Sequence, residues 1–185
     1  MPKELDQRQK ICAALEKLAR TKTISDIKVV DVCRLSGVPR TTFYYFFPDI
    51  YAVPQWIFDD IMSRSGALIG KSLSWDEAHR IMFSETLQIK ELFLKFSREN
   101  DHRSILEHGR RVGYRNIRNN IEARKKRTLT EHEAILLDYT FNAMSSLTTK
   151  WSRDGMVVPV ETAVQIISEL IPPEIKELCD IEKTT

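Results

Sequence analysis

Five side chains that could contact a nucleic acid are crowded into one short window of the sequence. They are Arg40, Thr41, Thr42, Tyr44 and Tyr45. An arginine can pair with a guanine through two hydrogen bonds, whereas threonine and tyrosine hydroxyls bond phosphate oxygens. A threonine methyl group can also contact the methyl group of a thymine. The residue types therefore predict a surface that touches both the base edges and the backbone of DNA.

Such a surface needs a short helix that protrudes from a compact support, and the segment 29–47 meets this requirement. We expect one short helix over 29–35 and another over 39–46. Gly37 suits the left-handed backbone conformation that ends a helix, and Pro39 suits the first position of the next one. The apolar residues of the segment form its expected inner side: Val32, Cys33, Val38, Phe43 and Phe47. The pattern predicts a helix-turn-helix unit.

The rest of the chain also has the pattern of helices. Apolar residues recur at intervals of three and four, and only six of 185 residues are glycine. Further helices are expected over 5–19, 49–64, 75 onwards, 87–98, 102–124, 131–153 and 159–171. Two capping boxes, Ser74 with Glu77 and Thr130 with Glu133, mark helix starts. We predict an all-α protein of about nine helices, with a three-helix head over 1–50 and a C-terminal helical domain over 51–185.

Composition and charge narrow the function classes. The net charge is only +2, so any basic footprint must be local. Cys12, Cys33 and Cys179 lie far apart, which argues against a disulfide framework or a zinc site and fits a reducing compartment. The polar N-terminus and the lack of a long apolar run argue against a signal peptide and a membrane span. We expect a cytoplasmic protein without a membrane partner, a metal or a cofactor.

The segment 27–53 resembles the DNA-binding domain of the TetR/AcrR family. The family pattern is roughly a T-V-x-D-I-A-like helix, then A-G-V, then S-R-x-T-x-Y-x-Y-F. Matching positions are Val29, Asp31, Val32, Cys33, Ser36, Gly37 and Val38, followed by Arg40, Thr42, Phe43, Tyr44 and Phe47. The resemblance implies a sequence-specific transcriptional regulator that binds palindromic double-stranded DNA as a homodimer. We expect a repressor that a small-molecule effector releases.

Several positions depart from the family pattern. Pro39 replaces the usual serine, Phe46 stands where tyrosine or histidine is common, and Ile50 stands where lysine is usual. Lys28 takes a place usually held by threonine or serine, and we include it among the DNA-contacting residues. Each lost ionic contact lowers the slope of log K against log salt concentration by about one unit. We therefore expect weaker or less salt-sensitive DNA binding.

The C-terminal helices resemble, less closely, the helix pair that joins two subunits in many family members. In the expected helix over 131–153 the apolar residues cover two faces, which need more partners than one domain easily supplies. The predicted dimer interface contains Phe141, Met144, Leu147, Trp151, Val164 and Ile167. The alternative is a core helix that is buried within one subunit.

In the family, the second domain often holds a small, mostly apolar ligand. The expected lining of such a site consists of aromatic residues: Phe83, Phe93, Phe96, Tyr114 and Tyr139. The alternative is that these are ordinary core aromatics. Gly109 and Gly113 lie in an expected helix, where each costs about 1 kcal/mol relative to alanine. They could leave space for a ligand, admit a close helix crossing or mark a helix break.

Two further segments invite a functional interpretation. The basic run between 110 and 127 could bind an acidic effector, a partner or DNA, or it could be a solvated face balanced by the acidic stretch after Glu131. The segment 66–72 resembles a phosphate-binding loop, but it is one residue short and follows no expected strand. No spacing typical of a nucleophile elbow or a catalytic carboxylate pair is present, and we expect no enzyme.

Two hypotheses compete with a DNA-binding regulator. The first is a protein–protein interaction module that keeps the fold but has weak or lost DNA binding, for which Phe46 and Ile50 are the support. The second is a nucleotide-dependent enzyme built on Gly70, Lys71 and Ser72. Selection from random duplex DNA tests the first, and nucleotide-induced thermal stabilisation tests the second.

Overall fold

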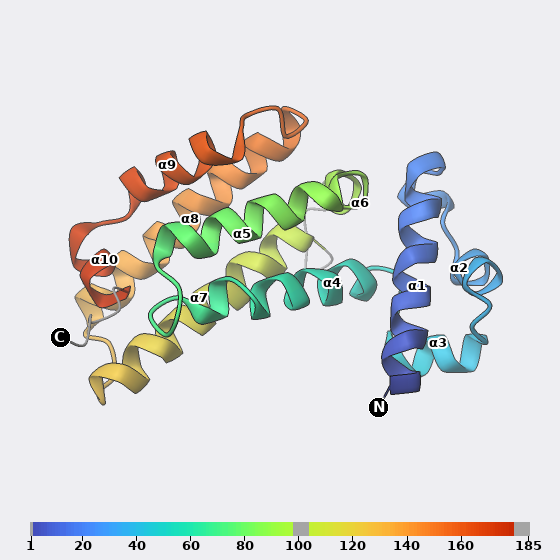
Figure 1. The fold of residues 1–185 in the computed structure, drawn as a ribbon, viewed down its shortest axis with the longest axis horizontal. Coiled ribbons are helices and arrows are strands. Elements are labelled where there is room, and N and C mark those ends of the chain that lie inside the picture. The colour runs from blue at the N-terminus through green and yellow to red at the C-terminus, as the bar shows by residue number, and fades with distance from the viewer. Residues whose placement is uncertain (1, 98–103, 180–185) are drawn as a thin grey trace.

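The computed structural model describes residues 2–97 and 104–179, which form ten α-helices (Figure 1). An N-terminal head contains α1 (Pro2–Thr21), the 3-10 turn η1 (Ile24–Asp26), α2 (Val29–Ser36) and α3 (Arg40–Phe46). The body contains α4 (Ala52–Ser63), the 3-10 turn η2 (Gly66–Leu68), α5 (Trp75–Gln88), α6 (Lys90–Phe96), α7 (Ile105–Lys125), α8 (Glu131–Arg153), α9 (Val160–Leu170) and α10 (Pro173–Cys179). The predicted all-α architecture is confirmed, and the expected boundary after residue 50 falls in the turn between α3 and α4.

The head is a three-helix unit that stands across one end of the body. In Figure 1, α1 runs across the direction of the long helices of the body. α2 packs on both α1 and α3, and Ile11 and Leu15 of α1 are fully buried together with Phe43 of α3. α1 also packs against α4 and α6, so the head is attached to the body by more than its connecting chain.

Local signals in the sequence set the helix ends. Gly37 adopts the left-handed conformation, with φ of 71°, and its N–H bonds the carbonyl of Cys33 to end α2. Asp49 Oδ1 accepts the backbone N–H groups of Tyr51 and Ala52 at the start of α4. Both predicted capping boxes are present at the starts of α5 and α8. Pro39 occupies the cap position, so α3 begins one residue later than expected.

The body is built around α7. This helix packs against α4 on one side and α8 on another, while α5 packs against α9 and α8 touches α9 and α10 (Figure 1). The aromatic core of the body includes Trp75, Phe83 and Phe93, each at most 2% exposed. The head and the helix α10 therefore lie at opposite ends of the molecule.

The structure differs from the expected helices in two places, and the expected start of one helix lies outside the described residues. Ile89 leaves helical geometry, with φ of −104° and ψ of 24°, so the expected helix over 87–98 is split between α5 and α6. α10 lies beyond the last expected helix, and it can begin at Pro173 because the first position of a helix needs no N–H. The expected start of α7 at residue 102 lies outside the described residues, and Ser104 is its cap in the structure.

Candidate DNA-binding surface and effector cavity

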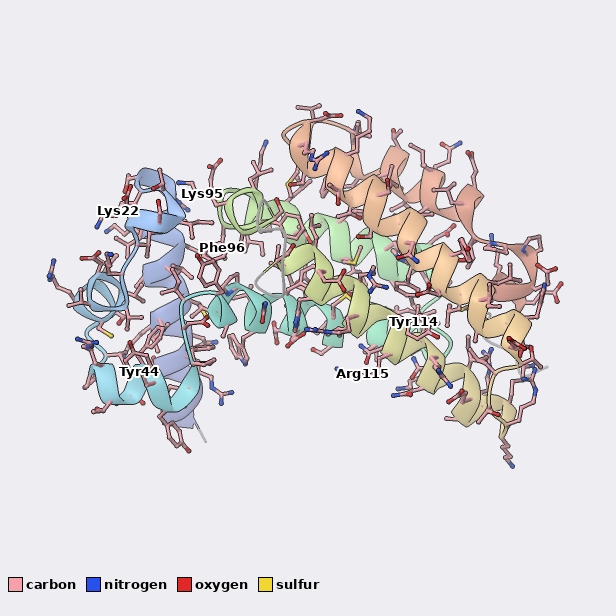
Figure 2. All side chains as sticks on the ribbon, turned by 180° about the vertical axis from the view of Figure 1, so that it is seen from behind. Lys22, Tyr44, Lys95, Phe96, Tyr114 and Arg115 are labelled. Carbon is pink, nitrogen blue, oxygen red and sulfur yellow. The ribbon has the colours of Figure 1, made fainter. Side chains whose placement is uncertain are left out.

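α3 presents opposite faces to the head core and to solvent. Phe43 is fully buried and Phe47, at the end of the helix, is 2% exposed, so both anchor α3 on the head. Tyr45 is 73% exposed and Tyr44 is 48% exposed (Figure 2). Thr42 is half-buried. The outer face of α3 thus carries four of the predicted contact residues: Arg40, Thr41, Tyr44 and Tyr45.

A hydrogen-bonded carboxylate joins α2 to the end of α1. Asp31 Oδ2 accepts from Lys22 Nζ at 3.1 Å and from the backbone N–H of Lys28 at 3.4 Å. The bond from Lys22 is the main reason why the pKa of Asp31 lies below its ordinary value. Lys28, the remaining predicted contact residue, is exposed at the start of α2. These bonds fix the support from which α3 protrudes.

Two arginines lie over aromatic rings of α3. The guanidinium carbon of Arg40 is 5.9 Å from the ring centroid of Tyr44, and that of Arg8 is 4.9 Å from the centroid of Phe46. Such cation–π contacts restrict the arginine and hold it near the ring. Sequence reasoning missed Arg8, because helical periodicity marks it only as a polar residue of α1. Its position beside α3 depends on tertiary packing.

The departures from the family pattern are explained by packing. Ile50 is only 8% exposed and belongs to the hydrophobic core, so it does not occupy a DNA-facing position in this protein. Phe46 is half-buried and lies under Arg8. Both side chains help to attach α3 to the rest of the protein. They therefore give less support to the hypothesis of a protein–protein interaction module that has lost DNA binding.

A cavity of about 70 Å³ lies within the body. Side chains of α4, α5, α6, α7 and α8 line it, and the lining is predominantly apolar. Phe83 and Phe93, two residues of the expected ligand site, border this cavity. Three methionines also border it: Met62, Met82 and Met144.

Three predicted ligand residues do not line this cavity. Phe96 is fully buried against Tyr51, with ring centroids 5.6 Å apart. Tyr114 packs edge-on against Phe141 at 6.0 Å, and Tyr139 is 71% exposed on α8. The rotation of each helix about its axis decides which aromatic residue borders a void, and sequence spacing alone does not fix that rotation.

Gly109 and Gly113 allow α7 to approach its neighbours closely. A Cβ atom at Gly109 would lie 2.6 Å from Cε1 of Phe58 in α4. A Cβ atom at Gly113 would lie 2.7 Å from Cε1 of Phe141 in α8. α7 continues through both positions, so they do not mark a helix break. Both glycines border the cavity, but a close helix crossing is what requires them.

One buried histidine borders the cavity and was not singled out from the sequence. His79 Nδ1 lies 2.7 Å from the backbone oxygen of Trp75, one turn earlier in α5. Burial lowers the pKa of His79 to about 4, so the ring is neutral near pH 7. The ring packs between Trp75, at a centroid distance of 4.5 Å, and Phe83, at 6.5 Å.

The side chains predicted to form a dimer interface are mostly used inside the subunit. Five of them are buried: Phe141, Met144, Trp151, Val164 and Ile167. Leu147 is half-buried and packs against the same core. The exposed face of α8 instead carries Ile135, which is 49% exposed, and Tyr139. The structure thus gives five of the six residues a place in the core of one subunit, and their part in a dimer interface stays a prediction.

At least four of the eight cationic residues between 110 and 127 bond partners within the chain. Arg110 bonds Glu107 at 2.9 Å, Arg118 bonds Glu122 at 3.0 Å and Arg127 bonds Glu133 at 2.6 Å. Arg124 donates to the backbone oxygens of Gly70 and Leu178. These pairs favour a balanced, solvated face over a binding site for an acidic partner.

The segment 66–72 does not have the geometry of a phosphate-binding loop. It forms the turn η2 and then a loop with an isolated bridge between Ile69 and Leu73, and the preceding element is a helix. Over residues 2–97 and 104–179, none of the helices is long and apolar enough to span a membrane.

Part of the chain is similar to curated HTH-type transcriptional regulators. Over 60 residues it is 33% identical to the HTH-type transcriptional regulator EthR of Mycolicibacterium smegmatis, a match that covers 32% of this chain and 28% of the relative. The EthR of Mycobacterium tuberculosis is 32% identical over 60 residues, with the same coverage. The matched part therefore spans less than a third of the length of these relatives. No family model matches the sequence.

Solved structures share the fold over nearly the whole chain. The dihydroxyacetone kinase operon activator DhaS superposes with a TM-score of 0.66 and 18% identity, over 94% of this chain and 98% of that one. A TetR transcriptional regulator from Rhodococcus sp. RHA1 superposes with a TM-score of 0.58 and 16% identity, over 92% and 98%. Together, these comparisons show that part of the chain is similar in sequence to HTH-type transcriptional regulators and that the chain shares the fold of a TetR transcriptional regulator.

Proposed function

We propose that the protein is a sequence-specific DNA-binding transcriptional regulator that acts as a homodimer on a palindromic operator. The observation that carries the proposal is the outer face of α3. On a helix short enough to enter the major groove, Arg40, Thr41 and Tyr45 are exposed while Phe43 anchors the opposite side. The similarity of a 60-residue stretch of the chain to the HTH-type transcriptional regulator EthR supports the same function.

In the proposed complex each side chain has a distinct role. Arg40 reads a guanine through its two parallel N–H groups, and Thr41 contacts a thymine methyl group or a phosphate. Tyr44 and Tyr45 donate to phosphates or lie against base edges, and Lys28 adds a phosphate contact from the start of α2. Two heads related by two-fold symmetry then read two half-sites about one helical turn, or a multiple of it, apart.

Whether the protein represses or activates transcription depends on where the operator lies relative to the promoter. A dimer bound across a promoter blocks polymerase and represses, and this is what we propose. The solved neighbour DhaS is named an operon activator, so activation is the second candidate. A reporter gene placed downstream of the selected operator separates the two. Reporter output falls with added protein under repression and rises under activation.

Selection from random duplex DNA with the purified protein tests the function. We expect a palindrome to be enriched, and Arg40→Ala and Tyr45→Ala each to weaken its binding about tenfold to a hundredfold, since a base contact contributes roughly 1–3 kcal/mol. Lys71→Ala is the matched control. It removes one exposed positive charge from the loop before α5 and leaves operator affinity unchanged.

The same selection separates the regulator from the alternatives. A lack of any enriched sequence at low salt would contradict the proposal and support a protein–protein interaction module. Equal losses of affinity for operator and random DNA in Arg40→Ala would show a phosphate contact without base reading. Both results leave the fold assignment unchanged.

We further propose that the cavity in the body holds a small-molecule effector. Its apolar lining and its position between α4 and α8 suit a ligand whose binding changes the spacing of two heads. The effector controls DNA binding by its differential affinity for the two arrangements of the dimer. Operator release on addition of the effector is the expected readout.

A further inference from the structure

Among the polar residues that border the cavity, Thr86, Thr148 and His79 share a property that Ser145 and Arg110 lack. Thr86 donates its hydroxyl hydrogen to the backbone oxygen of Met82 at 2.7 Å, and Thr148 donates to that of Met144 at 2.8 Å. His79 makes the corresponding bond to Trp75 within its own helix. A carbonyl oxygen can only accept, so each of these three residues uses its hydrogen in a bond to its own helix. These three groups can therefore offer a ligand only lone pairs.

His79 presents the strongest of these acceptors. Because Nδ1 carries the hydrogen that bonds Trp75, Nε2 of the neutral ring is a bare acceptor. Within the described residues no donor bonds Nε2, and the residue is 4% exposed. Its ring is held between two aromatic rings, so the position of Nε2 is fixed before a ligand arrives.

The surroundings of the cavity disfavour a charged ligand. Burial keeps the imidazole neutral, because its pKa is lowered to about 4. Arg110 is the charged residue at the lining, and its guanidinium is bonded to Glu107 at 2.9 Å and lies 3.6 Å from Asp138. A carboxylate ligand would have to compete with these two side chains. An uncharged ligand avoids that competition and the desolvation of a charge.

The size of the cavity sets the scale of the ligand. Its volume is about 70 Å³, roughly half that of an engineered cavity of about 150 Å³ that binds benzene. Met62, Met82 and Met144 border the space, and methionine side chains adapt readily because they are unbranched and flexible. Their movement would provide room for one small ring.

We propose that the cavity binds a small uncharged molecule with an apolar body and one hydroxyl or N–H group, which donates to Nε2 of His79. The ligand class is that of a phenol or a small alcohol, and His79 is its polar anchor. Binding of the ligand at His79 does not depend on the proposed function. Only the role of this ligand as an effector of DNA binding rests on that function.

Binding of three probes to the full chain tests the proposal. Phenol supplies a ring and a donor, toluene supplies the ring without the donor, and benzoate is charged at pH 7. Thermal shifts as a function of probe concentration give each Kd. We expect phenol and toluene to stabilise the protein and benzoate to have no effect. In His79→Leu, the ratio of the toluene Kd to the phenol Kd falls about fivefold, the effect of one hydrogen bond.

Thr148→Val is the matched control within the same cavity. It replaces a hydroxyl with a methyl group of similar size, and the ratio of the two Kd values should change by less than twofold. If His79→Leu does not fold, His79→Phe removes the same acceptor. Unequal circular dichroism spectra would identify such a folding defect before any probe is added.

Each other result overturns the inference. Three results would show that His79 is not the anchor. They are an unchanged ratio of the two Kd values in both His79 variants, a loss of the phenol preference in Thr148→Val alone, and a lack of binding by both phenol and toluene. Tight binding of benzoate assigns the anchor to Arg110. Operator binding measured in parallel separates the two proposals, because a protein that binds DNA but no probe retains its function as a regulator. If the protein binds phenol but no DNA, the proposed cavity site stands and the proposed function as a regulator fails.

Discussion

Glu133 illustrates how one carboxylate stabilises both a helix start and a nearby loop. It accepts the backbone N–H of Thr130 at 2.8 Å and that residue's hydroxyl at 3.0 Å. Arg127, in the loop before α8, adds two bonds of 2.6 and 2.7 Å. The bonds from Arg127 and then from Thr130 lower the pKa of Glu133 from 4.5 to about 2. The charged form is therefore favoured in the folded state.

Glu133→Gln tests this charge. A carboxyl whose pKa is lowered by folding adds stability that is fully present above pH 4.5 and is lost as the pH falls towards 2. Near pH 7 we expect the variant to have a free energy of unfolding lower by about 1 kcal/mol. The difference from the wild type narrows between pH 4.5 and pH 2. Urea unfolding across this range measures it, and Glu131→Gln, an exposed neighbour, serves as control with a change below about 0.5 kcal/mol.

At the scale of elements, α6 connects the cavity with the head. Phe93 of this short helix borders the cavity, and Lys95 Nζ donates to the backbone oxygen of Lys22 at the end of α1 (Figure 2). The side chain of Lys22 in turn bonds Asp31 of α2. Phe96 packs against Tyr51, next to the start of α4. One element thus touches the cavity, α1 and the root of α4.

Lys95→Met tests the contact of α6 with α1. It keeps an unbranched stem and removes the ammonium donor, so the carbonyl of Lys22 loses its partner. We expect faster amide hydrogen exchange over the end of α1 and over α2, by about fivefold, with no change in α8. Lys90→Met, at the first position of α6, should leave exchange in the head unchanged. Equal exchange in the two variants would show that this bond does not hold the head.

The sequence predicts where helices begin and end better than it predicts which residues of other helices they contact. The turn at Gly37, the caps at Ser74 and Thr130 and the exposed side of α3 depend on local chemistry, and the structure has them where we expected. The cavity lining and the outer face of α8 depend on how each helix is rotated against others. For this reason Tyr139 appeared as a ligand residue and Phe141 as an interface residue, although the first is exposed and the second is buried.

At the scale of the whole molecule, the exposed stripe on α8 is our proposed contact with a second copy of the chain. Ile135, Tyr139, Asn142 and Ser146 recur at intervals of three and four, which places them on one side of the helix. Ile135 and Tyr139 are large apolar or aromatic groups that solvent reaches in the single subunit. Asn142 and Ser146 are small enough to let a partner helix approach.

Tyr139→Glu tests the dimer. A charge buried at the centre of a two-fold interface faces its own copy, so we expect the dimer Kd to rise at least tenfold. Sedimentation measures the oligomeric state, and binding to the full palindrome should weaken by more than binding to an isolated half-site. Val157→Glu is the matched control, since Val157 is 74% exposed in the loop between α8 and α9. A Tyr139→Glu dimer as tight as the wild type would move the interface away from this stripe.

The absent side chains at Gly109 and Gly113 have a consequence for redesign. Because α7 meets Phe58 and Phe141 at separations that leave no room for a methyl group, a larger residue at either glycine would displace a phenylalanine ring that borders the cavity. We therefore expect the methionines at 62, 82 and 144 to be the positions of the lining at which the size of the accepted ligand can be changed. Trimming those three positions to valine or alanine is the direct route to a biosensor with a new specificity, without altering the scaffold that carries α3.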